Sequence, residues 1–250
     1  MKPVRLAALI VLASASLLSA PPLLAKPSDY AAAVADKARG EKNRALDVSR
    51  MPAEVLDFAG VTKGQTVVDY FTGSGYWAEM FSRAVGPRGV VYAADPPSFA
   101  DAKAWEPILA SHANVRMLLA PIAQMKFAPR SADLLFINLN YHDLYWESEK
   151  YKYPRVEVAG VLADWFTAVK PGGSVVIIDH AGPAGDTRAL VEKLHRIDPA
   201  QVKADMAAAG FVLDRESDLL RRTTDNHETN VFDPSVRGKT DRFMLKFRRP

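Results

Sequence analysis

Five short segments rich in apolar and β-branched residues constrain the fold of this chain more than any other feature. Stretches with apolar residues at helical spacing lie between them, at 76–85, 103–110 and 156–169. Strands that are apolar throughout are buried on both faces, which is typical of a parallel sheet covered by helices on each side. The pattern therefore predicts an α/β, doubly wound, Rossmann-like sheet with strands at 66–70, 89–94, 115–119, 132–139 and 174–179.

The remaining segments extend this arrangement at both ends. The stretch that separates the last two predicted strands is too short and too polar for a covering crossover, so the last strand is expected to run antiparallel. No linker rich in Gly or Ser divides the chain, which predicts one domain over 26–250. The added elements are strands at 211–217 and 242–248, helices at 187–194 and 199–209, and N-terminal helices at 29–38 and 42–59.

The first 25 residues have the composition of a leader. Lys2 and Arg5 precede an uncharged apolar run, and small residues follow around Ala20 and Ala25. This order is typical of a secretory signal peptide, cleaved here near Ala25. The alternative is an uncleaved membrane anchor, although the run is short for a span. We expect a secreted, periplasmic protein with no membrane attachment after cleavage.

Charge and cysteine content narrow the function classes. The 250 residues include 32 Lys and Arg against 29 Asp and Glu, and loss of Lys2 and Arg5 with the leader leaves a net charge of about +1. A nearly neutral body offers no electrostatic basis for binding nucleic acid. The chain has no Cys, which excludes disulfides, thiolate metal sites and a Cys nucleophile.

The turn after the first predicted strand is the candidate ligand site. The stretch VVDYFTGSGYWAEM, residues 67–80, places Gly73 and Gly75 between a strand and a helix. Ligands of doubly wound sheets bind at the carboxyl ends of the strands, where glycine lets the backbone approach them closely. The glycines also satisfy the dinucleotide pattern G-x-G-x-x-G/A, and they are equally compatible with a tight connection that binds nothing.

Two acidic residues favour one nucleotide over another. Asp95 ends the second predicted strand and can accept hydrogen bonds from both hydroxyls of a ribose, in NAD or in S-adenosylmethionine. Asp69 ends the first strand, where a carboxylate would repel a pyrophosphate but attract a sulfonium and an amino group. The pair favours S-adenosylmethionine, although either acid could instead cap a helix or turn.

The segments VVDYFTGSGYWAEM, VVYAADP, ADLLFINLNYHDL and VKPGGSVVIIDH occur in an order that resembles class I S-adenosylmethionine-dependent methyltransferases over about residues 50–248. The C-terminal stretch is similar to exported bacterial proteins predicted to be methyltransferases. The resemblance implies a seven-stranded, mostly parallel sheet whose last strand is inserted antiparallel, and S-adenosylmethionine as cofactor. It implies a cofactor site lined by Asp69, Gly73, Gly75 and Asp95, to which we add Thr72 of the same turn.

The chain departs from the pattern of that family at two places. The first glycine of the motif is replaced by Phe71, which could tighten or close the loop near the methionine end of the cofactor. The acid that often follows the third strand is missing from LLAPIAQM, where the backbone or Gln124 would take its place.

Polar residues after the fourth strand, in NLNYHDLYW, are the candidate catalytic groups. His142 is the first candidate for a base or for a group that orients the acceptor, because histidine titrates near neutral pH. Asn138 and Asn140 lie beside it in sequence, and His180 follows the fifth strand. Tyr141 is expected to form part of the substrate wall. Each could instead have a packing or capping role.

A metal site and a loop complete the candidates. Asp179 and His180, with Asp143 or Asn138, could bind a cation, but hard cations prefer more carboxylates, so no metal is predicted. The polar loop 223–242 is expected to hang over the site as a lid or binding element. Its candidate substrate-binding residues are His227 and Arg237, whereas His112 and His195 receive no role.

The function favoured by these observations is methyl transfer from S-adenosylmethionine to a small molecule or an envelope component. Two alternatives remain: an exported binding protein that keeps the fold without catalysis, and an NAD-dependent oxidoreductase. The sequence identifies neither the acceptor nor the oligomeric state.

Overall fold

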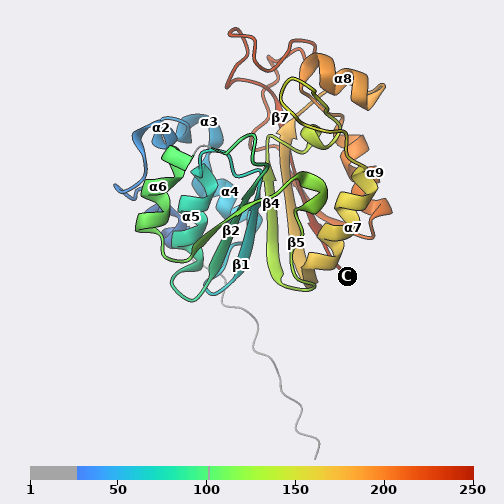
Figure 1. The fold of residues 1–250 in the computed structure, drawn as a ribbon. Coiled ribbons are helices and arrows are strands. Elements are labelled where there is room, and N and C mark those ends of the chain that lie inside the picture. The colour runs from blue at the N-terminus through green and yellow to red at the C-terminus, as the bar shows by residue number, and fades with distance from the viewer. Residues whose placement is uncertain (1–26, 101) are drawn as a thin grey trace, which may run out of the picture.

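A seven-stranded sheet forms the centre of the molecule (Figure 1). The computed structural model describes residues 27–100 and 102–250, so the predicted leader lies outside the described residues. The strand order is β3-β2-β1-β4-β5-β7-β6, and β7 runs antiparallel between β5 and β6. The strands are β1 (Thr66–Tyr70), β2 (Val90–Asp95), β3 (Val115–Leu119), β4 (Ala132–Asn138), β5 (Val169–His180), β6 (Val212–Ser217) and β7 (Arg242–Arg248). The predicted fold class is confirmed.

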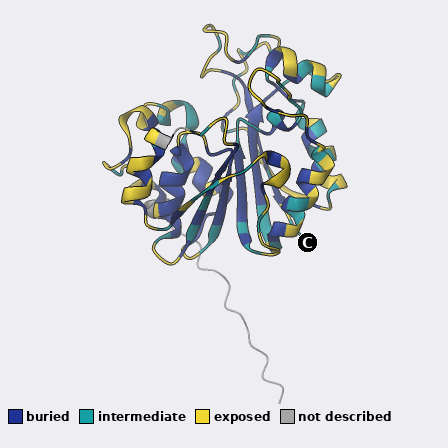
Figure 2. Cartoon of the chain, in the orientation of Figure 1, coloured by how far each residue is buried: buried dark blue, intermediate teal, exposed yellow. Residues whose placement is uncertain are grey.

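Helices cover both faces of the sheet, and Figure 2 shows the central strands as mostly buried. On one face, Trp77 and Phe136 belong to a core that α4, α5 and α6 cover. On the other face, Trp165 and Met206 belong to a core under α7 and α9. The helices are α1 (Pro27–Val34), α2 (Glu41–Arg44), α3 (Asp47–Arg50), α4 (Pro52–Ala59), α5 (Tyr76–Val85), α6 (Ala102–Ser111), α7 (Val158–Ala168), α8 (Thr187–Leu194) and α9 (Pro199–Ala208), with short 3₁₀ turns η1 (Ile122–Gln124) and η2 (His142–Leu144).

The N-terminal helices differ from the prediction. The helix expected over 42–59, with Pro52 near the start of its final stretch, is divided into α2, α3 and α4, of which α4 begins at Pro52. Proline disfavours the helical conformation in the residue before it, and Met51, which precedes Pro52, has φ +45°. The break lets α3 turn toward the carboxyl edge of the sheet, where Asp47 pairs with Arg39 at 2.7 Å and accepts a hydrogen bond from Tyr76 at 2.7 Å.

The fifth strand begins earlier than predicted. It was expected to start after Pro171-Gly172-Gly173, but β5 starts at Val169 and runs through these residues. The β4–β5 pairing shifts register between Ala132 and Leu134, and Gly172 takes φ +78° while its N–H donates to the carbonyl of Arg249. Glycine tolerates this irregular geometry, so the segment stays within the sheet instead of ending it.

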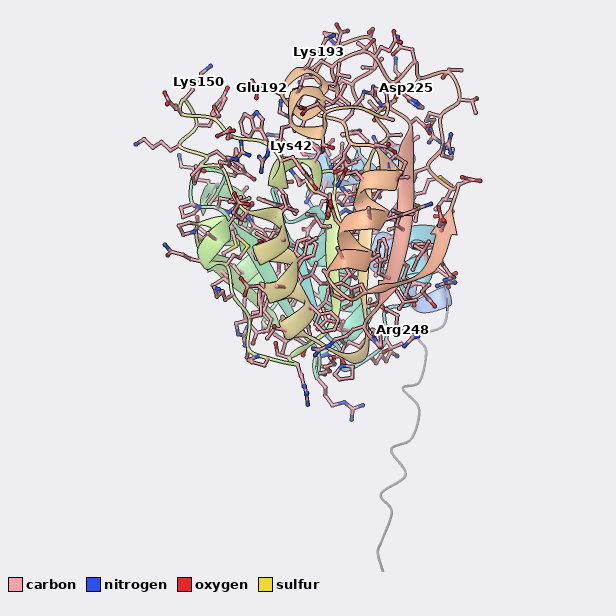
Figure 3. All side chains as sticks on the ribbon, turned by 90° about the vertical axis from the view of Figure 1, so that its right-hand side faces the viewer. Lys42, Lys150, Glu192, Lys193, Asp225 and Arg248 are labelled. Carbon is pink, nitrogen blue, oxygen red and sulfur yellow. The ribbon has the colours of Figure 1, made fainter. Side chains whose placement is uncertain are left out.

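A long connection between β6 and β7 lies at the carboxyl edge of the sheet. Figure 3 shows Asp225, in this connection, at the end of the molecule opposite Arg248. Arg196 holds it with a bidentate pair to Asp225, at 2.7 and 3.0 Å, and both side chains are buried. The connection is therefore an anchored part of the fold. None of the helices within 27–100 and 102–250 has the length and apolar character needed to cross a bilayer.

Candidate active site

A cavity of about 760 Å³ opens at the carboxyl edge of the parallel strands. This volume lies within the usual range of ligand pockets, about 300–1,000 Å³. Its walls come from α3, from the turns after β1, β2 and β4, from the end of β5, and from the connection that precedes β7. The polar and charged lining residues are Ser49, Arg50, Asp95, Asn140, His142, Asp143, His180, His195, Arg237 and Arg242.

The glycine turn after β1 forms one wall. Gly75 precedes α5 with φ +76°, and a Cβ there would lie 2.5 Å from Cδ1 of Ile108, so any other residue would strain the backbone and displace Ile108. Gly73 has φ +57° and lines the cavity. Its N–H donates to Asp95 Oδ2 at 2.9 Å, and its carbonyl accepts from Trp105 Nε1 at 2.9 Å. The turn is thus locked to the ends of two strands.

Phe71 occupies the left-handed conformation that the family pattern assigns to glycine. Its φ is +58°, which costs a residue other than glycine about 1–2 kcal/mol. The ring lies 5.1 Å from that of Tyr70 and forms part of the cavity wall. Phe71 lines the cavity without closing it, and the cavity stays open beside the ring.

Asp95 lies on the cavity wall, as a residue that binds ribose must. Only 2% of the residue is exposed, and burial raises the pKa of its carboxyl to about 7, while the hydrogen bond from Gly73 opposes that rise. The carboxylate that forms near neutral pH therefore lacks a full complement of partners, and it is suited to accept hydroxyl donors from a ligand.

Asp69 lies behind the turn and does not line the cavity. Thr72 Oγ1 donates to its Oδ2 at 2.5 Å, and both residues are buried. Burial raises the pKa of Asp69 to about 7, Thr72 lowers it, Asp95 raises it and the nearby Arg50 lowers it. The predicted direct contact of Asp69 and Thr72 with a cofactor does not fit this placement. Instead, Arg50 reaches the cavity wall, with its guanidinium 4.3 Å from the ring centroid of Tyr76.

His142 and Asp179 form a buried pair on the opposite wall. His142 Nδ1 lies 2.8 Å from Asp179 Oδ1, and its backbone N–H donates to Asp179 Oδ2 at 2.8 Å. Burial lowers the pKa of His142, but the charges of Asp179 and Asp143 outweigh it and raise the pKa to about 9. His142 is therefore a cation at neutral pH. The predicted pKa near neutrality, on which a role of His142 as a base depended, is therefore wrong. A role in orienting the acceptor fits this position.

The other candidates after β4 and β5 separate into two groups. Asn140 and His180 line the cavity, where Asn140 Nδ2 donates to Asp143 Oδ2 at 2.7 Å. His180 Nδ1 lies 2.7 Å from Thr240 Oγ1, and burial, with the nearby His142, Arg242 and Arg196 charges, lowers its pKa to about 3 against the opposing effect of Asp179. Asn138 ends β4 outside the cavity lining.

Tyr141 does not form a substrate wall. The residue has no exposed surface, and its hydroxyl donates to Asp205 Oδ2 at 3.0 Å, within the core under α9. Successive side chains of a 3₁₀ turn point in directions about 120° apart, so Tyr141, which precedes the turn, packs inward while His142, its first residue, faces the cavity.

The loop before β7 contributes one of its two predicted residues. Arg237 lines the cavity together with Phe232. His227 does not: its Nε2 lies 2.9 Å from Asp241 Oδ2, which places the ring in the ion-pair network that anchors the loop. The predicted role of His227 in substrate binding is therefore not supported by its position.

Sequence reasoning missed three basic residues of the cavity, namely Arg50, His195 and Arg242. His195 ends α8 in the left-handed conformation, with φ +49°, as helix C-terminal residues often do. Arg50 precedes the Met-Pro pair that ends α3. The Met-Pro pair was a usable signal for a break that would turn Arg50 toward the sheet. No local pattern marked His195 or Arg242.

No protein-family model matches the chain, but individual proteins do. It is 28% identical over 193 residues to the ubiquinone/menaquinone biosynthesis C-methyltransferase UbiE of Salmonella newport, a match that covers 76% of this chain and 66% of that protein. The matches span about half to two thirds of the length of such curated relatives.

Solved structures settle the fold. A SAM-dependent methyltransferase from Aquifex aeolicus matches 90% of this chain and 99% of its own, with a TM-score of 0.60 and 20% identity. The chain has the class I methyltransferase fold. Geranyl diphosphate C-methyltransferase from Streptomyces coelicolor A3(2), solved with Mg²⁺, geranyl-S-thiolodiphosphate and S-adenosyl-L-homocysteine, also matches, over 88% of this chain and 84% of its own, with a TM-score of 0.57 and 16% identity. In this chain the turn after β1 and the acid that ends β2 meet at one wall of the cavity, where the N–H of Gly73 donates to Asp95.

Proposed function

We propose that this protein is an S-adenosylmethionine-dependent methyltransferase that acts on a small molecule or an envelope component. The observation that carries the proposal is the shared cavity. Gly73 and Asp95 on one wall suit the nucleoside of the cofactor, while His142 on the other wall suits an acceptor. The similarity to UbiE and to solved methyltransferases supports the same chemistry.

The cofactor is placed by complementary charge. The Asp95 carboxylate accepts the ribose hydroxyls as charge-assisted hydrogen bonds. Arg50 offers its guanidinium to the carboxylate of the methionine moiety, and buried Asp69 supplies negative charge behind it. This arrangement replaces the expectation that Asp69 itself touches the cofactor. Phe71 packs against the ligand where the family pattern has only backbone.

Methyl transfer needs alignment more than acid–base chemistry, because the sulfonium is a good leaving group. Holding two reactants in line can contribute up to about 7–11 kcal/mol. The His142 ring, fixed by Asp179, lies at the cavity wall, where it orients the acceptor so that its nucleophilic atom faces the methyl group. The positive walls at Arg237 and Arg242 favour an acceptor that carries negative charge or electron-rich oxygen atoms.

Export remains part of the proposal. The leader-like composition of residues 1–25 supports export to the periplasm, where the acceptor would be an envelope component or a small molecule present there. Mass spectrometry of the mature N-terminus tests cleavage near Ala25: an intact leader on the purified protein would contradict it.

Calorimetric titration tests the cofactor. We expect the protein without residues 1–25 to bind S-adenosylmethionine and S-adenosylhomocysteine and not NAD. Asp95→Ala should weaken binding by about 1.5–3 kcal/mol, the range for hydrogen bonds to a charged group. Asp214→Ala, at an exposed position of β6, serves as the matched control. Binding of NAD alone, or equal affinity in the Asp95 variant and wild type, would contradict the proposal.

A further inference from the structure

His142, Asp143 and His195 bring three ligand atoms together at the cavity wall. Within the described part of the chain, these residues form a group that could hold a metal ion, with the three atoms all within 4.8 Å of one another. Asp143 Oδ1 lies 3.5 Å from His142 Nε2 and 3.9 Å from His195 Nδ1. A tetrahedral ion with bonds of about 2.0–2.2 Å holds its ligands about 3.3–3.6 Å apart, so small side-chain shifts complete the site.

The residues around the cluster orient each ligand. Asp179 binds Nδ1 of His142, which directs Nε2 toward Asp143. Asn140 donates to Oδ2 of Asp143, which leaves Oδ1 facing both imidazoles. A carboxylate on the outer nitrogen of a histidine is the usual support of a metal-bound imidazole.

The third ligand is held by packing and backbone geometry. The His195 ring contacts Trp146 and Phe232, at centroid distances of 5.4 and 4.9 Å. Its backbone takes the left-handed conformation that ends α8, and this helix end fixes where the ring lies.

We propose that His142, Asp143 and His195 bind a divalent first-row transition metal ion, such as Zn²⁺, Fe²⁺ or Mn²⁺, that keeps an open coordination position toward the cavity. Two imidazoles and one carboxylate suit such ions better than Mg²⁺ or Ca²⁺, which favour oxygen ligands. The ion replaces the proton on Nε2 of His142, which faces Asp143 in the metal-free protein. The metal set suggested by the sequence differs, since Asp179 and His180 are engaged by His142 and Thr240.

The open position identifies a class of acceptor, a point that rests on the proposed function. A hydroxyl compound that coordinates the ion loses its proton to solvent, because the metal stabilises the oxygen anion. A lone pair of that oxygen attacks the methyl carbon, the carbon–sulfur bond breaks, and its electrons return to sulfur to give neutral S-adenosylhomocysteine. The acceptor class is thus an oxygen nucleophile able to ligate a metal ion.

Metal titration of the protein without residues 1–25 tests the site, with Zn²⁺ followed by calorimetry and Co²⁺ followed by its visible d–d absorption. We expect saturable binding at a single site, with Mg²⁺ unable to compete. His195→Ala and Asp143→Asn should each weaken binding by at least about tenfold, and Asn140→Ala by about ten- to a hundredfold. His227→Ala removes a histidine outside the cluster and should bind like wild type.

Thermal melts show which variants stay folded, and Asp143→Asn keeps the shape of the side chain. Absence of saturable Zn²⁺ and Co²⁺ binding, or equal affinity in wild type, His195→Ala and Asp143→Asn, would overturn the site. The metal titration contains neither cofactor nor acceptor, so failure of the cofactor titration would not contradict the metal site. Conversely, if the metal site is contradicted, the proposal of methyl transfer still stands.

Discussion

The two walls of the cavity are built in different ways. The cofactor wall comes from a continuous stretch, β1, the glycine turn and the start of α5, joined by Asp95 from the next strand. The opposite wall gathers His142, His195 and Arg242 from the turn after β4, the end of α8 and the start of β7. The first wall is a local structure that short-range sequence pattern describes, whereas the second exists only when distant segments pack together.

This difference predicts that the wall built from distant segments is the more sensitive to single substitutions at the residues that hold those segments together. Arg196→Ala removes the cationic partner of the buried Asp225 carboxylate, which keeps only backbone donors, and the donors to the carbonyls of Ala181 and Thr229. We expect the free energy of unfolding to fall by about 3–5 kcal/mol, because a buried charge is left uncompensated. Urea denaturation measures it.

The matched control for that change is Lys203→Ala. Lys203 pairs with Glu216 at 2.6 Å, but both side chains are substantially exposed, so the loss should be below about 1 kcal/mol. Similar losses in the two variants would mean that the loop before β7 is not held by its buried pair.

Two glycine substitutions sharpen the description of the local wall. Gly75→Ala combines a positive φ with a methyl 2.5 Å from Ile108, and should destabilise the protein by about 2–5 kcal/mol. Gly73→Ala has a positive φ but open space around its Cβ, and should cost only about 1–2 kcal/mol. Thermal unfolding of both variants tests the difference, and equal losses would show that Ile108 moves aside.

Arg50→Ala tests whether this arginine binds the carboxylate of the cofactor. Removal of the guanidinium should weaken binding of S-adenosylmethionine by about 1.5–3 kcal/mol, because its carboxylate loses a charged donor. Adenosine lacks that carboxylate, so its affinity should be unchanged in the variant. Calorimetry with both ligands distinguishes this role from a general disturbance of α3, which would weaken both.

The pH dependence of cofactor binding gives the smallest expected effect. The pKa of Asp95 is raised to about 7, and ribose hydroxyls favour its ionised form. Below pH 7, binding must therefore include loss of a proton, so affinity should rise about tenfold between pH 6 and pH 8. Asp95→Asn should remove that rise when both proteins are titrated across this range. A steeper dependence would implicate Asp69, whose pKa is raised to about the same value.

Much of the fold follows from local pattern. The strands at 66–70, 115–119 and 242–248 and the helices at 76–85 and 187–194 lie where periodicity and turn residues placed them. The exceptions have local causes, namely the left-handed Met51 before Pro52 and the glycines that keep β5 continuous through Pro171. Asp95, Gly73 and His142 were found because each lies at the end of a recognisable strand.

By itself, the sequence determined a doubly wound sheet, its antiparallel last strand and the glycine turn that lines the cavity, because apolar periodicity and the conformational preference of glycine act over a few residues. Only the tertiary structure decided that Asp69 lies behind the turn, that Tyr141 packs inward, and that His195 meets His142 and Asp143. Burial and charge at a site depend on which distant segments surround it, and no short stretch of sequence records that neighbourhood.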